Sequence, residues 1–132
     1  MFGGDLLGLD LEDAKLRLGQ LQDALLRNAR YIVGIGIHTG KMTFAQGVDF
    51  FVNEGYQTRQ TAEKETKRGT SDAIYLYYTL GKLEIMKLRE DYRKAQGSAF
   101  RLQEFHDKFL GQGNPPIKIV RKAMLGNDSP VL

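Results

Sequence analysis

The sequence contains no cysteine among its 132 residues, and this absence excludes both a disulfide framework and a thiolate metal site. Histidine is nearly as scarce, with two copies. A zinc peptidase helix carries H-E-x-x-H, because two histidines one turn apart hold the metal. Neither His38 nor His106 is followed by glutamate, so the usual zinc motif is missing. A site that combines one of them with carboxylates brought in by folding is the less favoured alternative.

Long apolar runs and blocks of like charge are also missing. No run approaches the length of about 20 residues that a transmembrane helix needs, so we predict no membrane span. Nineteen Lys and Arg against sixteen Asp and Glu give a formal net charge of +3, interleaved along the chain. This distribution argues against a nucleic-acid-binding surface. The N-terminal residues include Asp5 and Asp10 and no basic segment, unlike a signal peptide. We expect a soluble protein, and its compartment is left open.

Two further catalytic motifs are absent. The stretch GIGIHTGK at 34–41 has glycines and Lys41, but neither the spacing nor the preceding strand of a phosphate-binding loop. No G-x-S-x-G occurs, and no cysteine nucleophile is available. The residues supply no complete catalytic set, so we predict no enzymatic activity for this chain alone.

The sequence is rich in helical periodicity. Apolar residues recur at spacings of three and four from Ala14 to Ile32, which predicts a long amphipathic helix. A second long pattern, from Ile74 to Tyr92, is apolar on more than one side and predicts a central helix. We therefore predict an all-α fold of five or six helices, two of them long, in one bundle-like unit. The predicted helices span 10–36, 43–54, 58–68, 71–96, 100–111 and 114–125, and 126–132 forms an extended tail.

Helix-capping residues support several of these bounds. Thr43 can cap the second helix, which Gly55 ends. The predicted helix 58–68 has little apolar content, so we expect it to be mostly solvated and to end at Gly69. The predicted central helix has cap candidates at its start, Thr70, Ser71 and Asp72.

The candidate site residues come from the two long helices. Guanidinium, imidazole and tyrosine hydroxyl groups bind carboxylates and stabilise oxyanions. The candidates are Arg27, Arg30 and His38 on the first long helix, and Tyr75 and Tyr78 at the start of the central one. On residue type alone, tyrosines at helical spacing are more often core residues. A histidine after an apolar run is more often a helix-end cap, and we favour a structural role for His106.

Three segments resemble one known family in order and spacing. They are LLRNARYIVGIGIHTGKMTFAQGVDFF, YLYYTLGKLEIMKLREDYRK and LQEFHDKFLGQGNPPIKIVRKAML. They are similar to the C-terminal part of a bacterial family catalogued as domain of unknown function eight hundred and eighty-five. That family in turn resembles helical zinc carboxypeptidases of the thermostable-carboxypeptidase and angiotensin-converting-enzyme type. The resemblance implies the C-terminal part of a larger helical metallopeptidase-like fold.

The resemblance also implies roles for the candidate residues. Tyr78 would donate to a developing oxyanion as a catalytic residue, and His38 would be its catalytic neighbour on the cleft wall. Arg30, Arg27 and Tyr75 would contact a peptide substrate. Zinc is implied for full-length relatives, whose H-E-x-x-H lies upstream, and no cofactor is expected in this chain. The sequence departs from the family at Gly34, where many members have an acid, and at Ala73, where many have proline.

Two hypotheses of different classes follow. In the first, the chain is a C-terminal segment of a zinc-peptidase-like protein, which supplies substrate-side cleft residues and is inactive alone. Its partner would be a missing N-terminal catalytic part. In the second, the chain is a non-catalytic helical module for interaction or oligomerisation, whose apolar surfaces meet another copy of itself or a partner chain.

Overall fold

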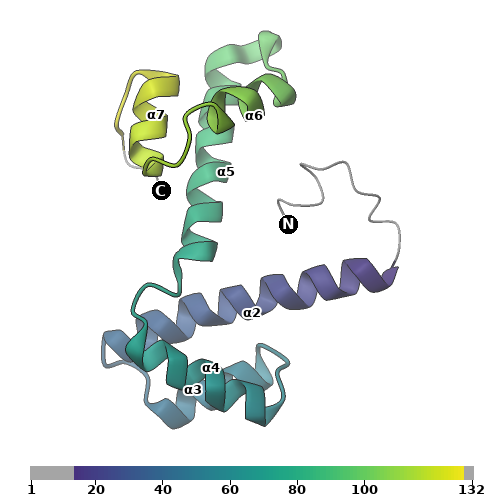
Figure 1. Cartoon of the computed structure of the whole chain (residues 1–132), viewed down its shortest axis with the longest axis vertical. Coiled ribbons are helices and arrows are strands. Elements are labelled where there is room, and N and C mark those ends of the chain that lie inside the picture. Colours follow the sequence, from purple (N-terminus) through teal and green to yellow (C-terminus); the bar gives the residue numbers. More distant parts are fainter. Residues whose placement is uncertain (1–13, 130–132) are drawn as a thin grey trace. The chain divides into compact units, whose positions relative to one another are not determined.

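The computed structural model describes residues 14–129, and these residues are all-α, as the sequence predicts (Figure 1). The two long helices have 25 and 20 residues. No strand occurs in the described residues. The elements are α2 (Ala14–His38), α3 (Phe44–Asn53), α4 (Arg59–Ser71), α5 (Tyr77–Gln96), the 3-10 helix η1 (Gly97–Ala99), α6 (Leu102–Leu110) and α7 (Ile117–Leu125).

Several helix bounds differ from the predicted ranges. The central helix begins at Tyr77 and not at 71, because Asp72 ends α4 and its Oδ1 accepts the Ile74 N–H at 3.3 Å. Gly69 lies inside α4 and does not end it. The Thr43 cap is confirmed, since its hydroxyl accepts the Gln46 N–H while the Gln46 side chain bonds the Thr43 N–H. Predicted positions 10–13 and 130–132 lie outside the described residues.

The described helices form the all-α, bundle-like fold that the sequence predicts, and they divide into two compact units. Unit 1 covers residues up to Thr79, and unit 2 covers Leu80 onward. Each unit has its own cluster of buried side chains. Helical periodicity identifies the apolar face of each helix, but it does not show which helices share a core.

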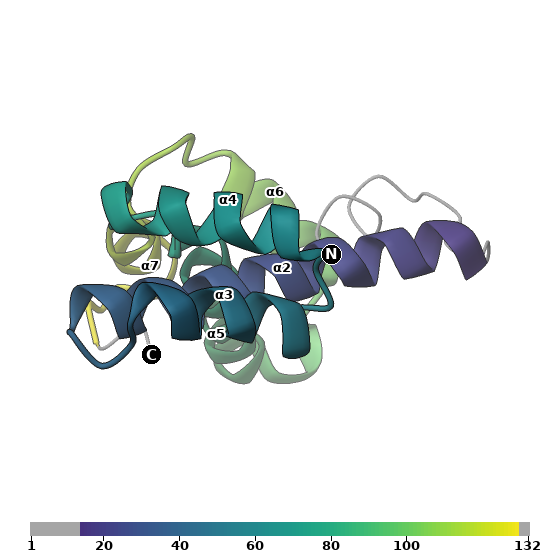
Figure 2. The ribbon, with the colours of Figure 1, turned by 90° about the horizontal axis from the view of Figure 1, so that it is seen from below.

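Unit 1 is a three-helix arrangement. The helices α3 and α4 lie side by side along the second half of α2, while the first half of α2 extends past them (Figures 1 and 2). The buried residues of α2 are four positions apart and those of α3 are three apart, so each of these helices presents one face to the core, and α4 adds one alanine. The buried cluster consists of Ala29, Val33, Val48, Phe51 and Ala62.

Unit 2 is built on α5 beyond Thr79, with α6 and α7 against it (Figure 1). Its buried cluster consists of Leu88, Tyr92, Phe105 and Val120. A charged residue is buried beside this cluster: the Arg121 side chain is 5% exposed, and its Nη1 lies 2.8 Å from Asp91 Oδ2. Its Nε donates to Asn127 Oδ1 at 3.0 Å, so Arg121 links α5 to the residues that follow α7.

Candidate functional site

The candidate residues of α2 lie on a face different from its core face. The core face is formed by Ala29 and Val33. Arg27, Gly34 and His38 recur at helical spacing on another side, and there α2 meets the segment 72–79 of the same unit. Thr79 Oγ1, at the end of that segment, donates to Asn28 Oδ1 at 3.1 Å. Unit 1 therefore brings the arginines of α2 and the predicted tyrosines together.

Tyr78 and Arg27 form the exposed part of this arrangement. The Arg27 guanidinium carbon lies 5.9 Å from the centre of the Tyr78 ring, within the range of a cation–π contact. Tyr78 is 48% exposed and stacks on Tyr77, with ring centres 4.7 Å apart. A hydrogen bond with the Tyr78 side chain raises the pKa of Tyr77. Two phenol groups and one guanidinium thus lie together at the surface.

Arg30 pairs with Glu65, a carboxylate that no sequence pattern singled out. Its Nε donates to Glu65 Oε2 at 2.7 Å and its Nη2 donates to Oε1 at 2.9 Å. Both side chains are largely buried. The hydrogen bond to Glu65 is the main cause that raises the pKa of Arg30, while burial opposes it. This two-pronged pair fixes the guanidinium and neutralises its charge.

His38 is the last residue of α2, and its ring bonds to α4. The Nε2 nitrogen lies 2.8 Å from the carbonyl oxygen of Gly69. Because a carbonyl only accepts, this geometry assigns the proton to Nε2. The imidazole therefore joins the end of α2 to the last turn of α4, and its Nδ1 is the nitrogen left to other partners.

Tyr75 is an interior residue in the described structure. It is 1% exposed, and its hydroxyl has no hydrogen-bond partner among the described residues. Burial is the largest cause that raises the pKa of Tyr75 to about 12, and the nearby Glu65 charge adds to it. In this conformation the Tyr75 side chain is enclosed, whereas the neighbouring candidate Tyr78 is half-exposed.

One residue of the site, Glu65, was not predicted from the sequence. The helix 58–68 was expected to be mostly solvated, yet α4 buries Ala62, Thr66 and Gly69 and directs Glu65 toward α2. The available signal was the spacing of four and three between these small residues, which marks one helix face even without large apolar side chains. The pairing of Glu65 with Arg30, 35 positions away, depends on the tertiary fold.

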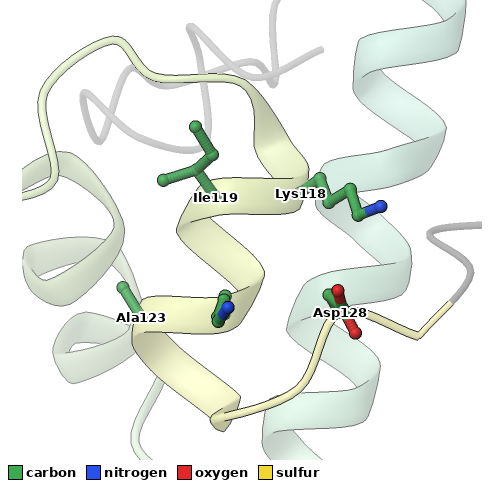
Figure 3. A pocket seen from close by; sticks show the side chains of 5 residues that line it. Lys118, Ile119, Ala123 and Asp128 are labelled. Atoms are coloured by element: carbon green, nitrogen blue, oxygen red, sulfur yellow. The ribbon is translucent and has the colours of Figure 1, made fainter.

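The described residues of unit 2 contain a polar cluster and a pocket. Tyr92 Oη accepts from Lys108 Nζ at 2.8 Å, and Lys108 pairs with Glu104 at 2.7 Å. The His106 ring packs edge-on against Phe105. A pocket of about 460 Å³ is lined by Lys118, Ile119, Lys122, Ala123 and Asp128. Figure 3 shows Lys118 and Asp128 on one side of α7 and Ile119 and Ala123 on the other.

The His, Asp and Glu side chains of the described residues are the groups that could hold a metal ion. No group of three or more His, Cys, Asp or Glu side chains in residues 14–129 is placed to hold a metal ion. These donors do not fit a zinc ion, which the resemblance implies for full-length relatives and not for this chain. Across the same residues, none of the helices has the length and apolar character required to cross a membrane.

Comparison with known proteins identifies the family. The described residues form an all-α protein with an arginine–tyrosine cluster at its surface. The chain belongs to the family described as bacterial protein of unknown function (DUF885), whose model matches residues 5–124. Neither a search of curated proteins nor a search of solved structures found a match.

Proposed function

We propose that this chain is the substrate-side segment of a peptidase-like hydrolase, in which Tyr78 and Arg27 bind a peptide carboxylate or a developing oxyanion. The observation that carries the proposal is the contact of the Arg27 guanidinium with the half-exposed Tyr78 ring. A phenol hydroxyl donates one hydrogen bond and a guanidinium supplies positive charge with several donors. Together they provide what an anionic oxygen requires.

The neighbouring residues support a division of roles within this segment. Arg30 donates two hydrogen bonds to the Glu65 carboxylate, so its role is to support the site. Arg27 is then the arginine available to bind an anionic ligand. Arg27 is more lightly held, since its ion pair with Asp23 is 3.8 Å long and both side chains are exposed. A weak surface pair is readily exchanged for a ligand carboxylate. His38, bonded through Nε2 to Gly69, would reach a substrate only through Nδ1.

In this proposal the residues of this chain do not bind the zinc ion of the related peptidases. Zinc in those peptidases activates water and polarises the scissile carbonyl. Since the donors described in residues 14–129 do not fit zinc, another part of a longer protein or a partner chain would supply it. The proposal therefore assigns this chain binding and orientation, and no hydrolysis by itself.

The test uses a metal-containing family member that hydrolyses peptides. Replacing the tyrosine that corresponds to Tyr78 by phenylalanine should slow turnover by about 10²–10³-fold, the usual effect of removing one oxyanion donor. In the present chain, a short peptide with a free carboxylate should shift the NMR signals of Arg27 and Tyr78, and its amidated form should not. Arg59→Gln is a matched control, because Arg59 makes only exposed ion pairs with Asp49 and Glu63 among the interactions described. Unchanged turnover in the tyrosine variant would rule the proposal out.

An interaction module is the second candidate, and one observation favours it. On α2, Leu18, Leu21, Ile32 and Ile35 are each at least 40% exposed. These residues form two pairs, and both pairs are centred on the same point of α2, midway between Leu26 and Arg27. The outer pair is Leu18 with Ile35, and the inner pair is Leu21 with Ile32. A second, antiparallel copy of α2 would therefore pair leucine with isoleucine along the whole row. Light scattering separates the candidates: a dimer that Leu21→Lys dissociates favours the module, and a monomer at high micromolar concentration excludes it.

A further inference from the structure

Two helical glycines in unit 1 have no backbone reason to be glycine. Gly34 lies inside α2 and Gly69 inside α4, and neither has a positive φ. Glycine in a helix interior is less stable than alanine by about a factor of five in the local equilibrium. Such positions therefore require another explanation, and close approach of a neighbouring group is the usual one.

That neighbour is the same residue for both glycines. A Cβ atom built on Gly34 would lie 2.9 Å from Cε1 of Tyr75. A Cβ built on Gly69 would overlap the Tyr75 hydroxyl oxygen and lie 2.8 Å from its Cζ. Real Cβ atoms do not approach ring atoms so closely. We call Gly34 and Gly69, which receive the Tyr75 ring between α2 and α4, the glycine socket.

The socket lies where the chain passes from α4 to α5. The segment 72–76 is tied to α4 by local bonds, such as the Asp72 N–H to the Arg68 oxygen at 2.9 Å. Tyr75 is the buried residue of this segment, and its ring reaches α2 at Gly34. Three residues later, Tyr78 lies over Arg27. The socket therefore fixes the backbone from which Tyr78 projects.

We propose that Tyr75 is a positioning residue: its ring, locked in the glycine socket, sets the segment 72–76 and thereby holds Tyr78 over Arg27. The catalytic meaning of this placement rests on the proposed function, whereas the placement itself does not. The hydroxyl of Tyr75 takes no part in the role, because it has no described partner. The ring, in contact with both glycines, carries it.

The first experiment is a thermal-stability cycle. Gly34→Ala and Gly69→Ala should each lower the melting temperature of the wild-type chain by about 5–10 °C, because the added methyl overlaps the ring. In a Tyr75→Ala background the same changes should raise it by about 4–8 °C, since alanine is then simply the better helix former. Gly19→Ala is the matched control: a Cβ at Gly19 of α2 meets no atom within 4 Å. It should stabilise both backgrounds equally.

Tyr75→Leu replaces Tyr75→Ala if the alanine variant does not fold, because it keeps apolar bulk while removing the ring edge and hydroxyl next to Gly69. Glycine substitutions with the same effect in both backgrounds would overturn the socket. The sign reversal is the result that the proposal requires.

The second experiment separates positioning from stability alone. Nuclear Overhauser contacts between the Tyr78 ring and the Arg27 side chain should be present in the wild type and in Tyr75→Phe. They should be lost in Tyr75→Leu at a temperature where that variant is folded. Retention of the contacts in folded Tyr75→Leu would overturn the positioning role.

A peptide-binding measurement distinguishes the proposed function from the positioning role of Tyr75. Affinity for a peptide with a free carboxylate should fall about tenfold in Tyr75→Leu and stay unchanged in Tyr75→Phe. A wild-type chain that binds no such peptide would count against the proposed function. In that case the stability cycle and the Tyr78–Arg27 contacts would still decide the socket.

Discussion

The two units of this chain each bury one tyrosine, and they treat its hydroxyl in opposite ways. In unit 1 the Tyr75 hydroxyl is enclosed without a described partner, and the ring fits against two glycines. In unit 2 the Tyr92 hydroxyl accepts from Lys108 and lies 3.4 Å from a Glu104 carboxylate oxygen. The Tyr92 hydroxyl thus has polar partners, whereas the Tyr75 hydroxyl has none described and its ring contacts two glycines and the Arg68 guanidinium. Burial alone does not reveal what a tyrosine contributes.

The arginines show a parallel contrast. Arg30 of unit 1 makes one bidentate pair with Glu65. Arg121 of unit 2 is more deeply buried and contacts Asp91, Asn127 and Ser129. Its Nη1 is close to Asp91, yet the hydrogen-bond geometry at that nitrogen is poor. The attraction at Nη1 is therefore mainly a charge–charge contact, and Nε makes the directed bonds.

The largest effect is expected from removing the more deeply buried cation. Arg121→Met should lower the free energy of unfolding by about 3 kcal/mol, because Asp91 loses one partner and the residues after α7 lose their anchor. Lys87 remains beside Asp91, which keeps the loss at the low end of the range for broken buried pairs. Arg30→Met should cost less, about 2 kcal/mol, since Glu65 can still reach water.

Urea melts with hydrogen exchange resolved by segment would check both values. The Arg121 variant should open amides of unit 2, and the Arg30 variant those of unit 1. A larger loss for Arg30→Met would reverse the comparison.

The next largest effect is the loss of stability at alkaline pH that the buried phenol of Tyr75 causes. Burial raises the pKa of Tyr75 from 10.0 to about 12, so the folded state favours the neutral phenol. The resulting stability is fully present below pH 10 and is lost as the pH rises from about 10 to 12, by on the order of 2 kcal/mol. Tyr75→Phe should lack this part of the alkaline loss, as the difference between two urea-melt series would show.

The stability of unit 2 should instead depend on pH in the acidic range. Lys87 first and Arg121 second hold the pKa of Asp91 below its usual value. A depressed carboxylate pKa gives stability that is present above the unfolded pKa of about 4 and lost as the pH falls through the folded value. Asp91→Asn should remove this acid-side slope. Identical slopes for the variant and the wild type would contradict the assignment.

The smallest effect on the free energy of unfolding is expected from removing the buried hydroxyl of Tyr92 or of Tyr75, and the two changes should have opposite signs. Tyr92→Phe should destabilise by about 0.5–1.5 kcal/mol, because a hydrogen bond from Lys108 is lost. Tyr75→Phe should be neutral or stabilising by up to about 1 kcal/mol, because it removes a buried polar atom without a described partner. Chemical denaturation of both variants measures this difference. A clear loss in Tyr75→Phe would show that its hydroxyl has a partner in solution.

Local sequence patterns were sufficient to predict the all-α class and most of the helices. Apolar spacings of three and four gave the long helices, and Thr43 gave the cap that begins α3. These features depend on interactions within a few residues along the chain, so local pattern is sufficient to predict them. The family was also accessible, since three segments in fixed order carried its resemblance.

The surroundings of the candidate residues depend on how the helices pack, which no local pattern predicts. Tyr75 and Tyr78 are three positions apart on similar sequence, yet one is enclosed and the other is half-exposed. The difference depends on Gly34 and Gly69, which lie 41 and 6 positions from Tyr75 along the chain and meet only in the folded unit. Likewise Glu65 became the partner of Arg30 across 35 positions. Contacts of this kind depend on how helices pack, and periodicity within one helix carries no information about its neighbour.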